Sequence, residues 1–179
     1  MPKTAIQNKQ IKDERRQSIL DASLPLFGLY HNLVTIDQIC EKAKCSHGLI
    51  YHYFKNTKDV LEALMNTKEC LSIKKELDCN IDRPTNERIE EITKSLLKIN
   101  NINRVSYLSI LIKDDSKKSF KNDLIKLVNN EQLDIKKSTD LVDVYLSALK
   151  GLYYNYLIDT KHEIPSLKRD ALISILKKR

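Results

Sequence analysis

The sequence holds few residues that break helices. Its 179 residues include 3 Gly, 4 Pro and no Trp. Gly and Pro are the least favourable residues inside a helix, whereas the Leu, Lys and Glu that are abundant here are among the better helix formers. The composition therefore predicts an all-α protein rather than a barrel, a sandwich or an α/β fold.

Long apolar runs are also missing. No stretch approaches the length of about 20 residues that a membrane-spanning helix needs. The N-terminal segment MPKTAIQNKQIKDERRQ is charged and lacks the apolar centre of a secretory signal. We therefore expect a cytoplasmic location and no membrane partner.

The sequence shows no recognisable metal or catalytic motif. Cys40, Cys45, His47 and His52 lie close together, but their spacing is not that of a zinc site. No Gly-rich phosphate loop and no paired nucleophile and base are visible. We expect no metal, no cofactor and no enzymatic activity. An all-α enzyme whose site is assembled from distant residues remains an alternative, as does a helical adaptor that binds proteins.

Positive charge is in modest excess. The formal net charge is +7 and the pI is about 9.1. Residues 1–60 hold seven Lys and two Arg against six acidic residues, so the N-terminal third is itself basic. This balance permits a polyanionic partner, although a lysine-rich solvated surface would produce the same numbers.

The first 54 residues contain the pattern of three successive helices. Residues 15–30 carry apolar side chains at three- and four-residue steps, which is typical of one face of a helix. Thr35 and Gln38 have the spacing of a capping box, which predicts a short second helix. Ser46 can cap a third helix over about 47–53. Two short helices joined by a turn of three or four residues indicate a helix-turn-helix.

The third segment, SHGLIYHYF, concentrates groups that suit a DNA groove. Leu49, Ile50, Tyr53 and Phe54 can face inward, which leaves the imidazole and phenol groups outside. A helix in the major groove reads bases from its exposed face, and helix N-termini favour phosphate oxygens. We predict DNA contacts from residues of both short helices and of the next connection: Thr35, Ser46, His47, Gly48, Leu49, Tyr51, His52, Tyr53, Lys55 and Lys58.

These residues resemble the tetracycline-repressor (TetR) family of bacterial transcriptional regulators. The resemblance lies in ILDASLPLF, TIDQICEKAKCSHGLIYHYF and TKDVL, within residues 15–64. Lys58-Asp59 matches the start of the helix that follows. Seven other positions match the family's pattern in register: Thr35, Ile39, Ala43, Ser46, Gly48, Tyr51 and Phe54. Lys44 departs from the pattern because it replaces the family's turn Gly.

The resemblance implies an organisation beyond DNA binding. It implies a helix-turn-helix domain at 1–56 and a helical effector-binding and dimerisation domain at 57–179. It further implies a homodimeric repressor that binds double-stranded operator DNA and leaves it when a small molecule binds. A helix-turn-helix protein that senses no effector is the alternative. Candidate residues for the effector cavity are Met65, Tyr107, Phe120 and Tyr145.

Residues 138–159 are apolar on nearly all sides, which is typical of a helix covered on nearly all sides. One side can meet the chain's own core and the other a second copy, and Gly151 would allow a close approach. A wholly internal core helix is the alternative. The family's last two helices pair with their copies, so the expected dimer interface comprises Leu149, Gly151, Leu152, Tyr156, Leu172 and Ile175.

Overall fold

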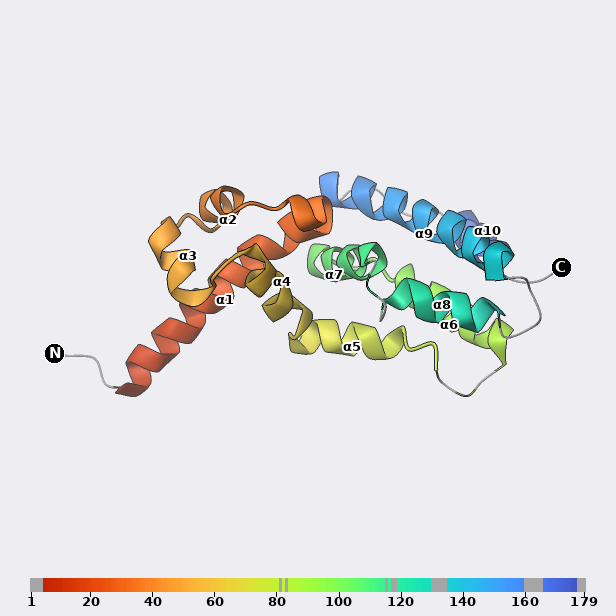
Figure 1. Cartoon of the computed structure of the whole chain (residues 1–179), viewed down its shortest axis with the longest axis horizontal. Coiled ribbons are helices and arrows are strands. Elements are labelled where there is room, and N and C mark those ends of the chain that lie inside the picture. Colours follow the sequence, from red (N-terminus) through yellow and green to blue (C-terminus); the bar gives the residue numbers. More distant parts are fainter. Residues whose placement is uncertain are drawn as a thin grey trace.

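Every secondary-structure element in the described part of the chain is a helix, and the molecule is elongated (Figure 1). The computed structural model describes residues 5–80, 82, 84–114, 116, 119–129, 135–159 and 166–176. The elements among these residues are α1 (Ala5–Tyr30), a 3₁₀ turn η1 (His31–Leu33), α2 (Ile36–Ala43), α3 (His47–Tyr53), α4 (Thr57–Met65), α5 (Lys68–Glu76), α6 (Thr85–Leu96), α7 (Ile102–Lys113), α8 (Phe120–Asn129), α9 (Ile135–Ile158) and α10 (Ser166–Leu176).

The two short helices begin where the sequence predicts. Thr35 and Gln38 form a complete capping box, in which the Thr35 hydroxyl accepts from the Gln38 N–H and the Gln38 side chain accepts from the Thr35 N–H. The Ser46 hydroxyl accepts from the Leu49 N–H and caps α3. Each cap satisfies a backbone donor that the first helical turn leaves without a partner. The predicted helix-turn-helix is therefore present, with residues 44–46 as its turn.

Two residues other than Gly adopt left-handed backbone conformations among the described residues. Lys44 has φ 50° and ψ 48° and ends α2, and His31 has φ 50° after the last turn of α1. These positions thus have the backbone conformation that Gly usually provides at a helix end. The conformation is sterically unfavourable for a residue with a side chain.

Replacing Lys44 by Gly should therefore stabilise the protein. The left-handed region costs an L-residue roughly 1–2 kcal/mol, and Gly avoids this cost while losing some chain entropy. We expect the free energy of unfolding in urea to rise by about 1 kcal/mol for Lys44→Gly. The control Lys42→Gly, at an exposed position inside α2, should lower it by about the same amount. Equal destabilisation by both variants would contradict the strained turn.

The sequence predicts one long fourth helix, capped by Asn56 or Thr57, whose inward residues include Val60, Leu61, Leu64 and Leu71, and the structure corrects this expectation. Residues 57–76 form two helices, because the chain breaks at Asn66 and the Thr67 hydroxyl caps α5 by accepting from the Cys70 N–H. Val60 and Leu64 are buried as expected, but Leu71 is 44% exposed, because the break turns it away from the core.

Helix α1 connects the helix-turn-helix with the rest of the molecule. It packs against α2 and α4 and, near its C-terminus, most extensively against α7. At the crossing, a Cβ on Gly28 would lie 2.9 Å from Ser106 Cα. Ser109 Oγ and Lys113 Nζ both donate to the Gly28 carbonyl, at 2.7 and 2.8 Å. The end of α1 is thus fixed to α7 by close backbone packing and by two hydrogen bonds.

A buried arginine joins α5, α6 and α7. Arg104 is 7% exposed, and its guanidinium donates to Glu76 Oε2 at 2.6 Å and to the Ser95 carbonyl at 3.0 Å. Ser95 Oγ also donates to the Glu76 carboxylate. The hydrogen bond from Arg104 holds the pKa of Glu76 below its usual value.

This ion pair predicts a pH-dependent contribution to stability. A carboxylate whose pKa is lowered in the folded state stabilises that state above its unfolded pKa, near 4.5, and the stabilisation is lost as pH falls through the folded pKa. We expect Glu76→Gln to cost about 2 kcal/mol at pH 7, because it weakens charged hydrogen bonds to a buried guanidinium. In denaturant titrations the wild type and the variant should converge as pH falls below 4.5 and through the lower pKa of folded Glu76. A difference that does not narrow as the pH falls through the acid transition would contradict this assignment.

Candidate nucleic-acid interface

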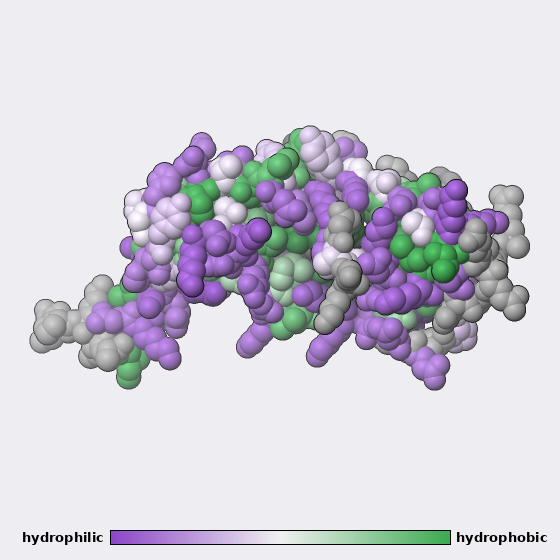
Figure 2. Space-filling view, viewed as in Figure 1, coloured by the Kyte–Doolittle hydropathy of each residue, from purple (hydrophilic) through white to green (hydrophobic). Residues whose placement is uncertain are grey.

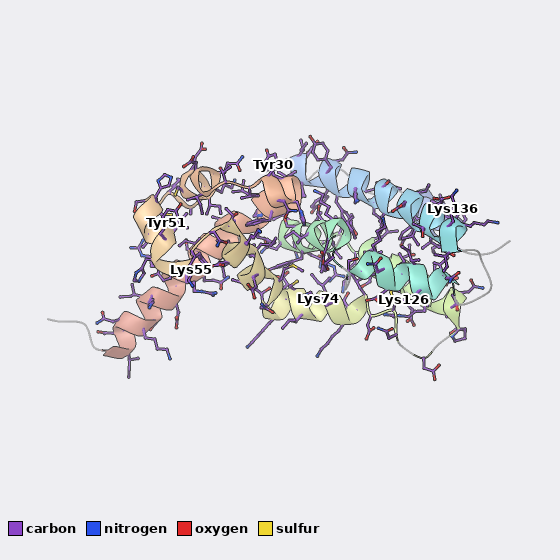
Figure 3. All side chains as sticks on the ribbon, viewed as in Figure 1. Tyr30, Tyr51, Lys55, Lys74, Lys126 and Lys136 are labelled. Carbon is purple, nitrogen blue, oxygen red and sulfur yellow. The ribbon has the colours of Figure 1, made fainter. Side chains whose placement is uncertain are left out.

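Helix α3 presents the face that the sequence predicts. His47, Gly48, Tyr51 and His52 are exposed, Leu49 and Tyr53 are half-buried, and Ile50 and Phe54 are buried. Tyr51 is 56% exposed and lies at the same end of the molecule as Lys55 (Figure 3). The buried pair anchors α3 and leaves the imidazoles and the Tyr51 phenol exposed at the surface.

The start of α3 is open as well as exposed. A Cβ on Gly48 would meet only Ser46 Oγ, at 4.0 Å. A side chain at this position would therefore project away from the protein and into the space that a docking partner must occupy. The hydroxyls of Thr35 and Ser46 act as acceptors within their caps, which leaves each hydroxyl proton available to an external acceptor.

One polar contact on this face was missed by sequence reasoning. His47 Nε2 lies 2.5 Å from Asp37 Oδ1, and both side chains are largely exposed. Asp37 is in the first turn of α2, ten residues before His47. The pair joins the N-terminal turns of the two short helices. Their positions at the start of two capped helices could have suggested it, but the angle between those helices is a tertiary feature.

The connection after α3 is held in a fixed conformation. The Asn56 side chain accepts from the Asp59 N–H and caps α4, and Asp59 Oδ2 accepts from the Lys55 N–H. Lys55 and Lys58 are both exposed. Lys55 therefore follows α3 on a short, hydrogen-bonded turn, and Lys58 lies in the first turn of α4.

Of the four candidate effector residues, two line one cavity. Met65 and Phe120 border a cavity of about 510 Å³ between α5, α7 and α8, together with Leu71, Leu111 and Cys79. Most of this lining is apolar, and the Lys74 and Lys75 side chains stand at its edge.

The two tyrosines lie elsewhere. Tyr107 borders a different cavity, of about 750 Å³, between α1, α4, α5 and α7, and its hydroxyl contacts Thr67 Oγ1 at 2.9 Å. Tyr145 borders neither cavity. It is fully buried, with its hydroxyl 2.9 Å from Thr93 Oγ1, and burial raises its pKa. In this structure Tyr145 faces the core from α9, so its place in an effector cavity stays a prediction.

The candidate dimer-interface residues also differ in burial. Leu149 and Leu172 are 0% and 3% exposed within their own chain, so their side chains cannot form an interface, and this expectation is corrected. Leu152, Tyr156 and Ile175 are half-buried, and Gly151 is exposed with nothing within 4 Å of an added Cβ. The face of α9 that is exposed instead carries Val144, Ala148, Gly151, Tyr154 and Ile158.

Taken together, α1–α3 define a helix-turn-helix protein whose second short helix is exposed, as in the DNA-binding proteins that read the major groove. Residues 19–64 match the family model described as "Bacterial regulatory proteins, tetR family". Within this segment the chain is similar to the TetR family of transcriptional regulators.

A curated relative and two solved structures are similar to this chain. It is 40% identical over 62 residues to the HTH-type transcriptional regulator HbdR of Aromatoleum sp. (strain CIB), a match that spans 33% of this chain and only 26% of the relative. The fatty acid degradation regulator FadR from Bacillus halodurans has a TM-score of 0.58 at 17% identity, with 90% of this chain and 94% of that chain covered. A TetR-like transcriptional regulator from Rhodococcus sp. RHA1 has a TM-score of 0.59 at 17% identity, covering 90% and 93%. The structural likeness establishes the fold along nearly the whole chain.

Two kinds of feature are absent from the described residues. No helix among them is long and apolar enough to cross a membrane. Within the same ranges, no group of three or more His, Cys, Asp and Glu side chains is arranged to hold a metal ion. His47, one of the four Cys and His residues that lie close together in the sequence, contacts Asp37.

Proposed function

We propose that this protein is a repressor that binds operator DNA as a homodimer and is released from it by a small molecule. The observation that carries the proposal is the outward face of α3, which presents His47, Gly48, Tyr51 and His52 beside a capped and unobstructed helix start. Residues 1–56 would form the DNA-binding domain, and residues 57–179 would sense the effector and form the dimer.

The side chains on this face divide by the chemistry of their contacts. His47, Tyr51 and His52 have groups that can hydrogen-bond base edges in the major groove. The hydroxyls of Thr35, Ser46 and Tyr53 and the ammonium groups of Lys55 and Lys58 suit phosphate oxygens. Phosphate contacts set the register and base contacts set the sequence. The absence of a Cβ at Gly48 would allow the DNA backbone to approach the helix closely.

The exposed apolar face of α9 supports a dimer. Val144, Tyr154 and Ile158 are 58%, 54% and 62% exposed, on the side of the helix that also carries Ala148 and Gly151. Helical spacing places the five on one face, with the two small residues at its centre. A second copy packed there would bury them, and operator binding by the dimer requires the two α3 helices to reach half-sites about 34–36 Å apart.

Replacing Gly151 by Glu should weaken this dimer. The added side chain meets nothing in its own chain, so the protomer should fold normally, but a carboxylate would be buried between two α9 helices. We expect the dimer dissociation constant to rise by more than tenfold in sedimentation. The control Lys94→Glu, at an exposed position on α6, should leave it unchanged. An unchanged molar mass for Gly151→Glu would argue against this interface.

The cavity bordered by Met65 and Phe120 is the proposed effector site. It lies between α5, α7 and α8, and Met65 is the last residue of α4, which follows the α3 helix after a short, capped turn. A ligand that prefers a shifted α4 would misplace α3 and lower operator affinity by the difference between its affinities for the two arrangements.

Selection of genomic fragments tests the function directly. The purified protein should enrich fragments that contain an inverted repeat, and a DNA footprint should cover both halves. Small molecules that bind the cavity should release such fragments. Failure to enrich any duplex would contradict the DNA-binding proposal, whereas DNA binding that no ligand changes would favour a regulator without an effector.

A further inference from the structure

Helix α1 extends well beyond the body of the protein as a helical arm. Residues 6–15 are exposed apart from half-buried Ile11, and the first buried residue is Ile19. At 1.5 Å per residue the ten-residue arm is about 15 Å long. The match to the family model starts at residue 19, so the arm lies outside it. Figure 1 shows the arm projecting past α3 at the N-terminal end of the molecule.

The arm carries its positive charge on the side that faces the helix-turn-helix. Lys9, Lys12 and Arg16 follow at steps of three and four residues and so share one face, with Arg15 at one margin and Asp13 at the other. The same face continues into the core as Ile19 and Leu20, both 2% exposed. Beyond the edge of the domain, the core-facing side of α1 is thus basic instead of apolar.

One contact fixes the direction of this basic face. The Arg16 guanidinium lies over the Phe54 ring, 5.1 Å from its centre, and Phe54 is the residue that ends α3. Lys12 and Lys9, one and two turns earlier, therefore point to the space beside the C-terminal end of α3. Glu14 lies on the opposite side of the arm, where it accepts from Gln10 Nε2 at 2.9 Å. Hydrophilic side chains predominate on the arm in Figure 2.

We propose that this arm binds the phosphate backbone of duplex DNA outside the segment that α3 reads. The proposal rests on the proposed operator binding. A duplex held against the exposed face of α3 continues past the end of that helix, into the space that Lys9 and Lys12 face. The arm then adds at least two charge-assisted phosphate contacts per protomer and lengthens the footprint at both of its outer ends. These contacts carry no base specificity, so they strengthen binding to any duplex.

The test compares two variants that lose equal charge. Lys9→Gln/Lys12→Gln removes two cations from the arm. Lys126→Gln/Lys136→Gln removes two exposed cations from α8 and α9, at the far end of the molecule (Figure 3). Each protein is titrated with its selected operator and with a duplex of arbitrary sequence over a range of salt concentrations, and hydroxyl-radical footprints are recorded. Because the arm side chains contact little else, circular dichroism should be unchanged.

The arm variant should lose about 0.9 in the slope of log affinity against log salt for each phosphate contact removed, on both duplexes. Its footprint should lose protection at the outer ends and keep the pattern over the half-sites. The control variant should match the wild type in slope and footprint. Equal slopes for the arm variant and the wild type would overturn the proposal while leaving operator binding intact. A wild type that binds neither duplex would instead refute the proposed function itself.

Discussion

Replacing Gly28 by Val is expected to lower the free energy of unfolding by about 3 kcal/mol. A Cβ at this position would lie 2.9 Å from Ser106 Cα and 3.0 Å from Ser106 Cβ. Because the nearest atom belongs to the backbone of α7, no side-chain rotation can relieve the overlap, and α1 must move away from α7. The Ser109 and Lys113 hydrogen bonds to the Gly28 carbonyl would then lengthen or break.

Urea denaturation followed by circular dichroism measures this effect, and Gly48→Val is the matched control. Gly48 is also helical, but an added Cβ there meets only Ser46 Oγ at 4.0 Å, so we expect stability within about 0.5 kcal/mol of the wild type. For operator binding we expect the reverse, with the effect in Gly48→Val. Gly48→Val should weaken operator binding in a fully folded protein, because its side chain fills space at the proposed DNA surface. Equal stability of both variants would contradict the close packing of α1 on α7.

The double variant His47→Ala/Tyr51→Ala is expected to lower operator affinity by at least about 30-fold. Each side chain is exposed on α3, and a good contact to a base edge is worth about 1–3 kcal/mol, so that two contacts at the lower limit give this factor. The free energy of unfolding should change little, because neither side chain is buried. Fluorescence anisotropy with a labelled operator measures the affinity.

Tyr30→Ala serves as the control for this variant. Tyr30 is 47% exposed but lies at the other end of α1, away from α3 (Figure 3). Its removal should leave operator affinity unchanged. Wild-type affinity in the His47/Tyr51 double variant would remove the basis for the proposed DNA interface.

The candidate dimer and effector residues show where the sequence could not decide which side chains are buried in the core. Helix α9 is apolar on nearly all sides, so its sequence alone could not assign its inner face. The structure buries Leu149 and leaves Val144 and Tyr154 exposed. Similarly, Tyr145 carries the same phenol as Tyr107, and only the packing of α9 against its neighbours makes Tyr145 a core residue hydrogen-bonded to Thr93.

The sequence by itself determined the local features of this protein. Caps at Thr35, Ser46 and Asn56 act within four residues, and helical periodicity assigns Ile50 to the inside and Tyr51 to the outside. The existence of α3 and the face that it exposes therefore follow from short-range chemistry. Tertiary structure alone decided three other features: the contact of His47 with Asp37, the fixed crossing of α1 and α7 at Gly28, and the direction of the basic arm. The physical reason is that each depends on the angle between two helices. Many side chains distant in sequence set that angle together.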